Sequence, residues 1–317
     1  MDSAAAVEAV HAGMGTQMAH KAFGRYAAQA LRAVEQEAQR LERILSRFLP
    51  ESDVGRINRS AGVKHERVSP ETYEILLCAL ECSCISGGVF DATVGPLSDL
   101  WDFKHASEPP AAERLAKVLP LVNYRDLELC TVGKTAGLKN PGQSIDLGGI
   151  GKGFTSDRFM EILREYGVTS AWSNIGGNVS TLGNKSDGLP WRVGIRHPRK
   201  SDLIGAVAVT GKAVVTSGDY ERYFLDKKGR RFHHILNPVT GYPANSGLLS
   251  VTVVADSAMI ADAVSTAVFV AGIEKGLPIL NKYRVEAVLV DTGLQVYATR
   301  GLRQSFQASA EVKTRYI

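Results

Sequence analysis

Apolar residues recur at helical spacing in several parts of the chain. Over residues 27–48 they repeat at steps of three and four with charged residues between them, which predicts a long amphipathic helix packed on a core. Ser69 followed by Pro70 is a typical helix start, and the apolar run behind it predicts a helix to about residue 86. The same spacing predicts further helices over residues 111–118, 155–166 and 257–272.

Shorter apolar runs in the second half of the chain predict strands. Residues 204–209 and 213–216 are expected to pair as a hairpin around Gly211, and residues 224–232 form a second expected hairpin. Strongly apolar runs indicate buried strands, and the remaining strands are expected over residues 171–175, 191–195, 248–255 and 285–290.

The predicted elements form one unit, with no internal repeat and no clear linker. Residues 1–13 are expected to be an N-terminal tail, residues 51–58 a polar loop, and the chain after Arg300 shows little pattern. A chain of 317 residues is long enough to bury a large core. We therefore predict a single α+β domain over residues 14–317, with mixed sheets and packed helices in two intimately packed subdomains.

Composition and charge narrow the class of protein. The 37 basic and 33 acidic residues give a formal charge of +4, and the basic residues are spread along the chain. This pattern argues against nucleic acid as a partner but suits a small anionic ligand. No run approaches 18 apolar residues, so we expect no membrane segment. The N-terminus lacks the basic and apolar regions of a leader, and four cysteines without a disulfide pattern fit a reducing compartment, so a cytoplasmic location is expected.

The stretch from Ser144 to Asp157 is the first candidate for chemistry. Its apolar start resembles the end of a buried strand, four glycines follow at positions 148, 149, 151 and 153, and helical spacing comes next. A glycine-rich turn at a helix N-terminus is suited to binding an anion, and Asp146 and Lys152 flank this one. A tight turn without a ligand explains the glycines equally well. The spacing matches neither a dinucleotide-binding fingerprint nor a P-loop.

Asp262 and Thr266 form the second candidate site. They lie four residues apart, so they share one face of a helix that is otherwise apolar. A buried carboxylate is costly unless it is paired or binds a metal, and a carboxylate with a hydroxyl suits Mg²⁺. The alternative is that Asp262 pairs with an arginine while Thr266 bonds to its own helix.

The third candidate is a histidine pair, His233 and His234, before the turn Asn237-Pro-Val-Thr-Gly241. His234 is a possible general base near neutral pH, although a single histidine is more often structural. The motifs Gly-x-Ser-x-Gly and His-Glu-x-x-His are both absent, so neither hydrolase signature applies.

Taken together, these motifs resemble the ApbE family of FAD-dependent flavin transferases. Any one of them is weak evidence, but eight matching stretches occur in the order found in that family. They are Met14–Thr16, Leu45–Asn58, Phe90–Trp101, Ser144–Asp157, Asn174–Asn178, Ser217–Tyr220, His234–Gly241 and Asp262–Ala267.

The resemblance implies a T-fold-like α+β structure and a specific activity. Members of the family bind FAD and Mg²⁺, transfer FMN to a threonine or serine of a target flavoprotein through a phosphoester bond, and release AMP. Some relatives instead hydrolyse FAD to FMN and AMP. The resemblance places the metal on Asp262, Thr266 and the main-chain carbonyl of Gly149. It places FAD on Met14, Asp91, Thr93, Asp146, Lys152 and the backbone of Leu236.

By the same resemblance, His234 activates the acceptor hydroxyl, and Asp262 and Lys152 complete the catalytic set. Two positions depart from the family pattern, since Gly151 replaces the usual alanine and Asn237 replaces an aspartate. An FAD pyrophosphatase and a flavin-binding protein without catalysis stay open as alternatives. Retention of the metal pair, the lysine and the histidine argues against the pure binder.

Overall fold

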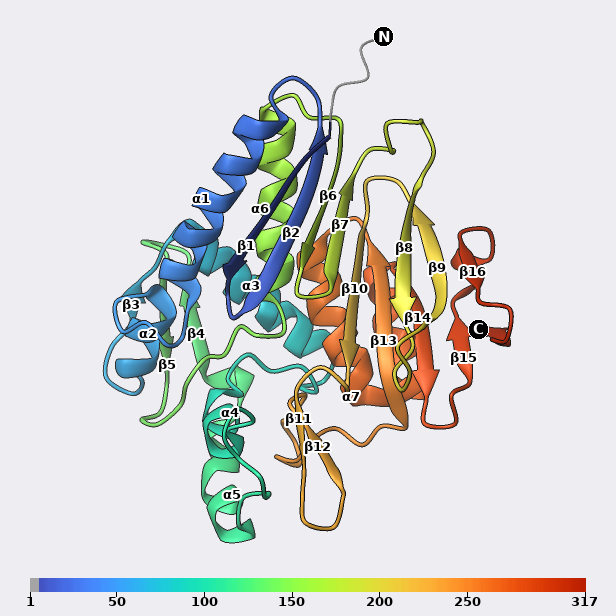
Figure 1. Ribbon diagram of the computed structural model, residues 1–317. Helices are drawn as coiled ribbons and strands as arrows, with labels where there is room; N and C mark the ends of the chain where they lie inside the picture. The colour runs from blue at the N-terminus through green and yellow to red at the C-terminus, as the bar shows by residue number, and fades with distance from the viewer. Residues whose placement is uncertain (1–5) are drawn as a thin grey trace.

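The computed structural model describes residues 6–317 and consists of a large sheet covered by helices on one face (Figure 1). The sheet has nine strands in the order β1-β2-β6-β7-β10-β13-β14-β15-β17. Every neighbouring pair is antiparallel except β15 and β17. The α+β class with a mixed sheet, predicted from the sequence, is therefore confirmed.

The helices are α1 (Ala27–Leu45), α2 (Asp53–Arg59), α3 (Pro70–Ile85), α4 (Gly95–Trp101), α5 (Ala112–Val118), α6 (Gly151–Glu165) and α7 (Ala258–Tyr283). The strands are β1 (Ala6–Gly13), β2 (Thr16–Phe23), β3 (Glu66–Arg67), β4 (Leu127–Cys130), β5 (Thr135–Leu138), β6 (Ser170–Ile175), β7 (Asn178–Leu182), β8 (Trp191–Arg196), β9 (Leu203–Val209), β10 (Ala213–Gly218), β11 (Tyr223–Leu225), β12 (Arg231–His233), β13 (Leu248–Ala255), β14 (Glu286–Asp291), β15 (Val296–Ala298), β16 (Phe306–Ala308) and β17 (Thr314–Tyr316).

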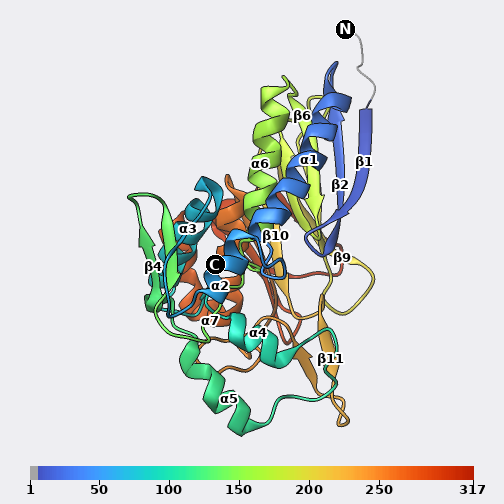
Figure 2. The same cartoon turned by 90° about the vertical axis from the view of Figure 1, so that its left-hand side faces the viewer.

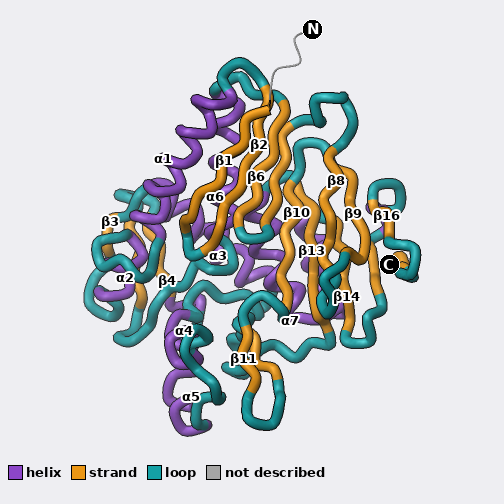
Figure 3. Tube along the Cα trace, in the orientation of Figure 1, coloured by secondary structure: helices purple, strands orange, loops and turns teal. Residues whose placement is uncertain are grey.

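The large sheet lies between two layers, as the turned view shows (Figure 2). Helices α1, α3, α6 and α7 form one layer, and the small sheet β16-β9-β8 packs on the opposite face. Strands β13 and β14 carry apolar side chains toward both layers, so their residues are buried almost without exception. The tube drawing shows the α4–α5 segment and the β11–β12 hairpin at one end of the molecule (Figure 3).

Most long predicted elements are confirmed. Helices α1 and α3 begin where expected, and the Ser69 side chain accepts a hydrogen bond from the N–H of Thr72, as its capping role predicts. The hairpin predicted over residues 224–232 is β11 paired with β12. Strands β6, β8, β13 and β14 lie within one residue of their predicted bounds at most ends.

The predicted N-terminal tail is wrong for residues 6–13, which form β1. Strand β1 pairs with β2 along its whole length, through a two-residue turn in which Met14 and Gly15 have φ of 50° and 71°. These values are those of a type I′ hairpin turn, which matches the twist of its strands. The residues of β1 show no clear alternation of apolar and polar positions, and at the edge of the sheet none of them is fully buried, so the strand signal was weak. Residues 1–5 lie outside the described part of the chain.

Other local predictions are also corrected by the structure. The loop expected over residues 51–58 contains α2, because Ser52 accepts the N–H of Gly55 as an N-cap. Residues 204–209 and 213–216 do not pair with each other: β9 joins β8 and β16, whereas β10 joins β7 and β13. The chain after Arg300 contributes β16 and β17.

Helix α7 continues past the predicted end at Gly272, where φ of 80° produces a kink rather than a stop. By length and composition alone, α7 is apolar enough to cross a membrane, with a mean hydropathy of 1.5. In the folded protein 61% of that apolar window is buried. Helix α7 is therefore a core helix of the fold.

Helices α6 and α7 cross so closely that their backbones are in contact. A β-carbon on Gly153 would lie 2.3 Å from the carbonyl oxygen of Ala258, well inside contact distance. Asp157 on α6 accepts the main-chain N–H groups of Ala258 (2.7 Å) and Met259 (3.0 Å). It also accepts the hydroxyl of Ser257, so α6 supplies a carboxylate to the N-terminus of α7.

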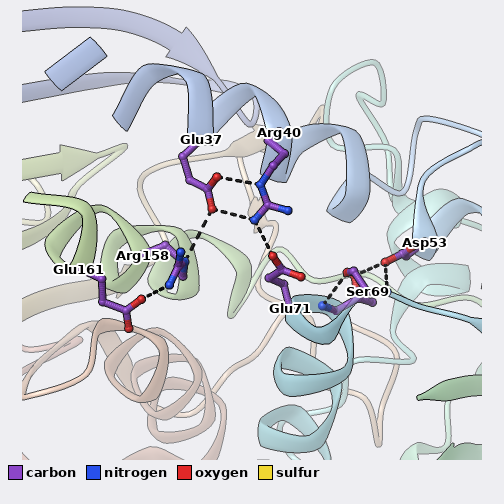
Figure 4. A network of polar contacts seen from close by, with 8 residues as sticks. Glu37, Arg40, Asp53, Ser69, Glu71, Arg158 and Glu161 are labelled. Carbon is purple, nitrogen blue, oxygen red and sulfur yellow. Dashed lines mark hydrogen bonds and ion pairs between the residues drawn. The ribbon is translucent and has the colours of Figure 1, made fainter. Parts of the chain in front are cut away.

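An ion-pair network ties α1, α3 and α6 together at their exposed edges (Figure 4). Arg40 donates to both oxygens of Glu37 at 2.8 Å and to Glu71 at the start of α3 at 2.6 Å. Arg158 on α6 lies 3.7 Å from Glu37 and pairs with Glu161. Glu37, at the centre of the network, is only 12% exposed, whereas its arginine partners are 33–40% exposed, so the network joins the three helices through partly buried charges.

The helix crossing yields a stability prediction. Gly153→Ala is expected to lower the free energy of unfolding by about 1–3 kcal/mol, since the new methyl group must push two backbones apart. Gly151→Ala is the matched control, because a β-carbon there meets only Leu147 at 3.7 Å. We expect the control to be neutral or slightly stabilising. Urea unfolding followed by circular dichroism measures both, and equal midpoints for the two variants would contradict the close crossing.

Candidate functional site

The glycine turn is held in place by side chains rather than by a strand. The expected strand before it is absent, and only an isolated bridge joins Ser144 to Val94. Asn58 from α2 instead pairs with the backbone of Ile145, accepting its N–H at 2.7 Å and donating to its carbonyl at 3.1 Å. An amide side chain thus replaces a strand neighbour and fixes the start of the turn.

The turn leads into α6, whose first residues meet a carboxylate from α7. Asp262, which is 3% exposed, accepts the N–H of Gly153 at 2.9 Å. Its other oxygen lies 3.6 Å from Nζ of Lys152, and this ammonium also donates to the carbonyl of Gly148 at 2.9 Å. The structure therefore brings Asp262 and Lys152 together at the glycine turn, as the sequence predicted.

Thr266 and Gly149 also meet at this point. A β-carbon on Gly149 would lie 3.4 Å from Oγ1 of Thr266 and 3.2 Å from the ring of Phe90, so the turn and the Thr266 side chain approach each other closely. Thr266 Oγ1 lies 3.1 Å from Oγ of Ser217, at the end of β10. The Asp262 carboxylate and the Thr266 hydroxyl thus both lie at the glycine turn.

This donor set fits a hard cation that keeps ligands from its substrate. All of the donors are oxygens, which Mg²⁺ prefers to nitrogen or sulfur. Within residues 6–317 no group of three or more His, Cys, Asp and Glu side chains is arranged to hold a metal ion. One carboxylate does not make a closed protein cage, so further oxygens would have to come from a bound anion or water.

His234 lies immediately after β12, and its ring is oriented by the main chain. Nδ1 lies 3.2 Å from the carbonyl oxygen of Arg222, so it donates there and leaves Nε2 as the acceptor. Burial, together with the charges of Arg222 and Lys152, lowers the pKa of His234 to about 4, although the hydrogen bond to the Arg222 carbonyl acts in the opposite direction. The imidazole is therefore neutral near pH 7. Its neighbour His233 is buried and binds the carbonyl of Ala244, which is a structural role.

Comparison with known proteins agrees with this geometry. The model of the ApbE family matches residues 14–289. A relative from Klebsiella pneumoniae (strain 342), named FAD:protein FMN transferase, is 36% identical over 301 residues, covering 92% of each chain. The solved ApbE protein of Thermotoga maritima has a TM-score of 0.87 at 31% identity, covering 94% of this chain and 98% of its own. The flavin transferase ApbE of Vibrio cholerae has a TM-score of 0.86 at 26% identity, covering 95% and 99%.

The chain belongs to the ApbE family. The resemblance inferred from eight short motifs is thereby confirmed over most of the chain.

In this ApbE chain, the side chains of Asp91 and Thr93 form hydrogen bonds within the protein. The buried Asp91 carboxylate accepts the N–H and hydroxyl of Thr93, both at 2.7 Å, and the N–H of Tyr124 at 2.8 Å. Thr93 Oγ1 in turn accepts the N–H of Asn123. Burial raises the pKa of Asp91, and these hydrogen bonds counteract the rise. The pair holds the loop beside Phe90, while direct contact with FAD stays a prediction.

Met14 and Leu236 lie at two different borders of the site. Met14 forms the β1–β2 turn, and its sulfur accepts the hydroxyl of Thr155 on α6 at 3.3 Å. Leu236 is buried in a cluster with Trp101 and bridges to Pro243 through its main chain. Their predicted FAD contacts also stay predictions, although both residues belong to segments adjoining the glycine turn or His234.

Arg47 is a site residue that the sequence reasoning did not single out. Its guanidinium donates to Asp146 at 3.1 Å, to Asp99 at 2.8 Å and to the carbonyl of Gly95 at 3.3 Å. It thereby joins the end of α1 to α4 and to the glycine turn, where Asp146 also accepts the N–H of Gly148. The adjoining Phe48 is 81% exposed, and its ring lies 5.5 Å from the Arg47 guanidinium. The sequence signals for Arg47 were its place in the matching stretch Leu45–Asn58 and the basic-aromatic pair that it forms after a long helix.

The loop around Asp91 provides a test of its structural role. Asp91→Ala is expected to lower the free energy of unfolding by about 2–4 kcal/mol without any ligand, because two buried N–H groups lose their acceptor. Asp99→Ala is the control, since that carboxylate is largely exposed and should contribute no more than about 0.5 kcal/mol. Chemical denaturation of the ligand-free protein measures both, and similar values would contradict the structural role.

Proposed function

We propose that this protein is an FAD:protein FMN transferase that attaches FMN to a threonine or serine of an acceptor flavoprotein and releases AMP. The observation that carries the proposal is the meeting of Lys152, Asp262 and Thr266 at the glycine turn, close enough to His234 for the lysine charge to act on its ring. Relatives named FAD:protein FMN transferase, matching most of the chain, support the same assignment.

The charges at the site suit a metal-bound diphosphate. Asp262 and Lys152 balance each other, so a divalent cation held by Asp262, Thr266 and the Gly149 carbonyl would leave two positive charges uncompensated. The diphosphate of FAD supplies two negative charges and the missing oxygen ligands. Mg²⁺ at this position would draw charge from the phosphoryl oxygens during transfer. The N-terminus of α6 and Lys152 would stabilise the same oxygens.

His234 would remove the proton from the acceptor hydroxyl. As the proton passes to Nε2, the hydroxyl oxygen forms a bond to the FMN phosphorus, and the bond from that phosphorus to the oxygen bridging to AMP breaks. The Arg222 carbonyl holds Nδ1–H and can stabilise the imidazolium that forms. The products are a phosphoester on the acceptor and free AMP.

An FAD pyrophosphatase is the alternative that shares this site. Water in place of the acceptor hydroxyl would give FMN and AMP from the same metal and base. Incubation with FAD, Mg²⁺ and a flavoprotein acceptor separates the two activities. Acceptor mass rising by one FMN supports transfer, whereas FMN and AMP without labelled acceptor would identify the hydrolase. If FAD stays unchanged, the remaining alternative is a flavin-binding protein without catalysis.

Removal of either metal ligand is expected to abolish both transfer and hydrolysis. Asp262→Asn keeps an acceptor for the Gly153 N–H but loses the charge, and Thr266→Val keeps the shape but loses the hydroxyl. We expect each to reduce turnover at least about 100-fold. Thr266→Ser is the matched control and should keep most activity. Titration with Mg²⁺ should show weakened binding in the first two variants, and wild-type Mg²⁺ dependence in either would remove that residue from the metal site.

His234→Ala is expected to slow transfer by about 10² to 10⁴ while FAD binding changes little. His233→Gln serves as the control for a histidine that binds only the main chain. Initial rates measure transfer, and flavin fluorescence measures FAD affinity. Loss of FAD binding in His234→Ala would assign the ring to the substrate site instead of the base.

The lowered pKa of His234 also predicts the pH profile. A neutral base is required, and the imidazole stays neutral until the pH falls toward about 4. The value of kcat/KM for FAD reports the ionisation of groups of the free enzyme. Protonation of His234 should therefore lower kcat/KM only below about pH 5. An acid limb centred near pH 6.5 that disappears in His234→Ala would contradict this.

A further inference from the structure

Five of the 37 basic residues lie close together in the segment 222–231, which contains the β11–β12 hairpin. Its ten residues include five basic side chains and a single acidic one. Their formal charge of +4 equals that of the whole 317-residue chain. The impression from the sequence that basic residues are spread along the chain is thus corrected for this hairpin.

The one acidic residue of the hairpin does not offset this charge at the surface. Asp226, whose side chain is 2% exposed, accepts the N–H groups of Lys228 and Arg230 and pairs with Nε of Arg230. Its carboxylate is therefore used to close the turn. Lys227 is 90% exposed and lies 3.6 Å from Glu108, a solvated pair. Arg231 lies 3.8 Å from Asp219, whereas within residues 6–317 Lys228 and Arg222 have no ion-pair partner within 4.0 Å.

An aromatic cluster fixes the hairpin to the rest of the protein. Phe224 and Phe232 stack across its strands with ring centroids 5.4 Å apart. Phe232 also lies 5.6 Å from the fully buried ring of Trp101 at the end of α4. A hairpin anchored in this way presents its charges in a defined position, unlike a free loop.

The same hairpin leads directly to His234. The main-chain N–H of His234 donates to the carbonyl of Arg222, so the first residue of the basic segment touches the base. The basic segment is therefore in direct contact with the residue that would meet the acceptor hydroxyl. Lys152, at the glycine turn, is the basic side chain that would face the diphosphate of FAD.

We propose that residues 222–233 are the docking surface for the acceptor protein and select segments with acidic side chains beside the modified hydroxyl. This inference rests on the proposed function, since it assigns the approach of the second substrate to the same base. Complementary charge would raise the association rate and fix the direction in which the acceptor segment crosses the site.

A pair of peptides tests the docking surface without depending on catalysis. Both are dye-labelled and carry one central threonine; one has four aspartates near it, and the other has four asparagines at the same positions. Fluorescence anisotropy without FAD gives the affinity of each at about 50 mM and about 150 mM salt. The variant is Lys227→Glu with Lys228→Glu, on the exposed turn, and circular dichroism confirms that it is folded.

The matched control is Lys275→Glu with Lys282→Glu, two exposed lysines on α7 that change the net charge by the same amount. We expect the wild type and this control to bind the aspartate peptide about ten-fold tighter than the asparagine peptide at low salt, and less so at higher salt. The hairpin variant should bind both peptides alike, with unchanged affinity for FAD.

Several results would overturn the docking surface. These are equal binding of both peptides by the wild type, equal loss of preference in the hairpin variant and the control, and a hairpin variant that loses only FAD affinity. Hairpin-dependent binding of a single-stranded oligonucleotide in place of the aspartate peptide would assign the charge to nucleic acid. Addition of FAD and Mg²⁺ followed by mass spectrometry then tests transfer separately. If the protein keeps its preference for the aspartate peptide but no acceptor gains FMN, the proposed function is contradicted. The docking surface is still supported in that case.

Discussion

The site depends on one contact, the hydrogen bond from the N–H of Gly153 to the carboxylate of Asp262. It is possible only because α6 and α7 cross without a β-carbon between them at Gly153. The crossing places a buried carboxylate against the first turn of a helix, where positive partial charge stabilises it. Asp157 makes the reciprocal contact, since it lies on α6 and receives the first N–H groups of α7. The two helices thus fix each other's N-terminal ends.

The electrostatics of the site follow from that crossing. Asp262 is balanced by one lysine, so the site is close to neutral until a divalent cation and an anion enter together. Under the proposed function, such a site would bind the metal and the diphosphate cooperatively, because each would supply charge and ligands that the other needs. The imidazole of His234 stays neutral near pH 7 because burial and the charges of Arg222 and Lys152 lower its pKa. In the proposed function it would therefore be ready to accept a proton.

Much of the local structure was predictable from the sequence, and so was the list of reactive side chains. The predicted bounds of α1 and α3 were close because their caps and apolar spacing are local signals. Short elements were predicted less well. The helix α2 was missed because a seven-residue segment shows little periodicity, and β1 because its apolar and polar residues do not alternate clearly. The hairpin proposed for residues 204–216 failed because both strands found better partners from distant parts of the chain.

By itself, the sequence determined where α1, α3 and α7 begin and which side chains are available for chemistry. These properties depend on neighbours a few positions away. Only the tertiary structure decided that Asp262 reaches Gly153 across 109 positions, that Arg47 reaches Asp146 across 99, and that Asn58 holds Ile145 across 87. Such contacts arise when helices and sheets bury their apolar faces together, and the spacing of residues along a chain carries no record of which faces will meet.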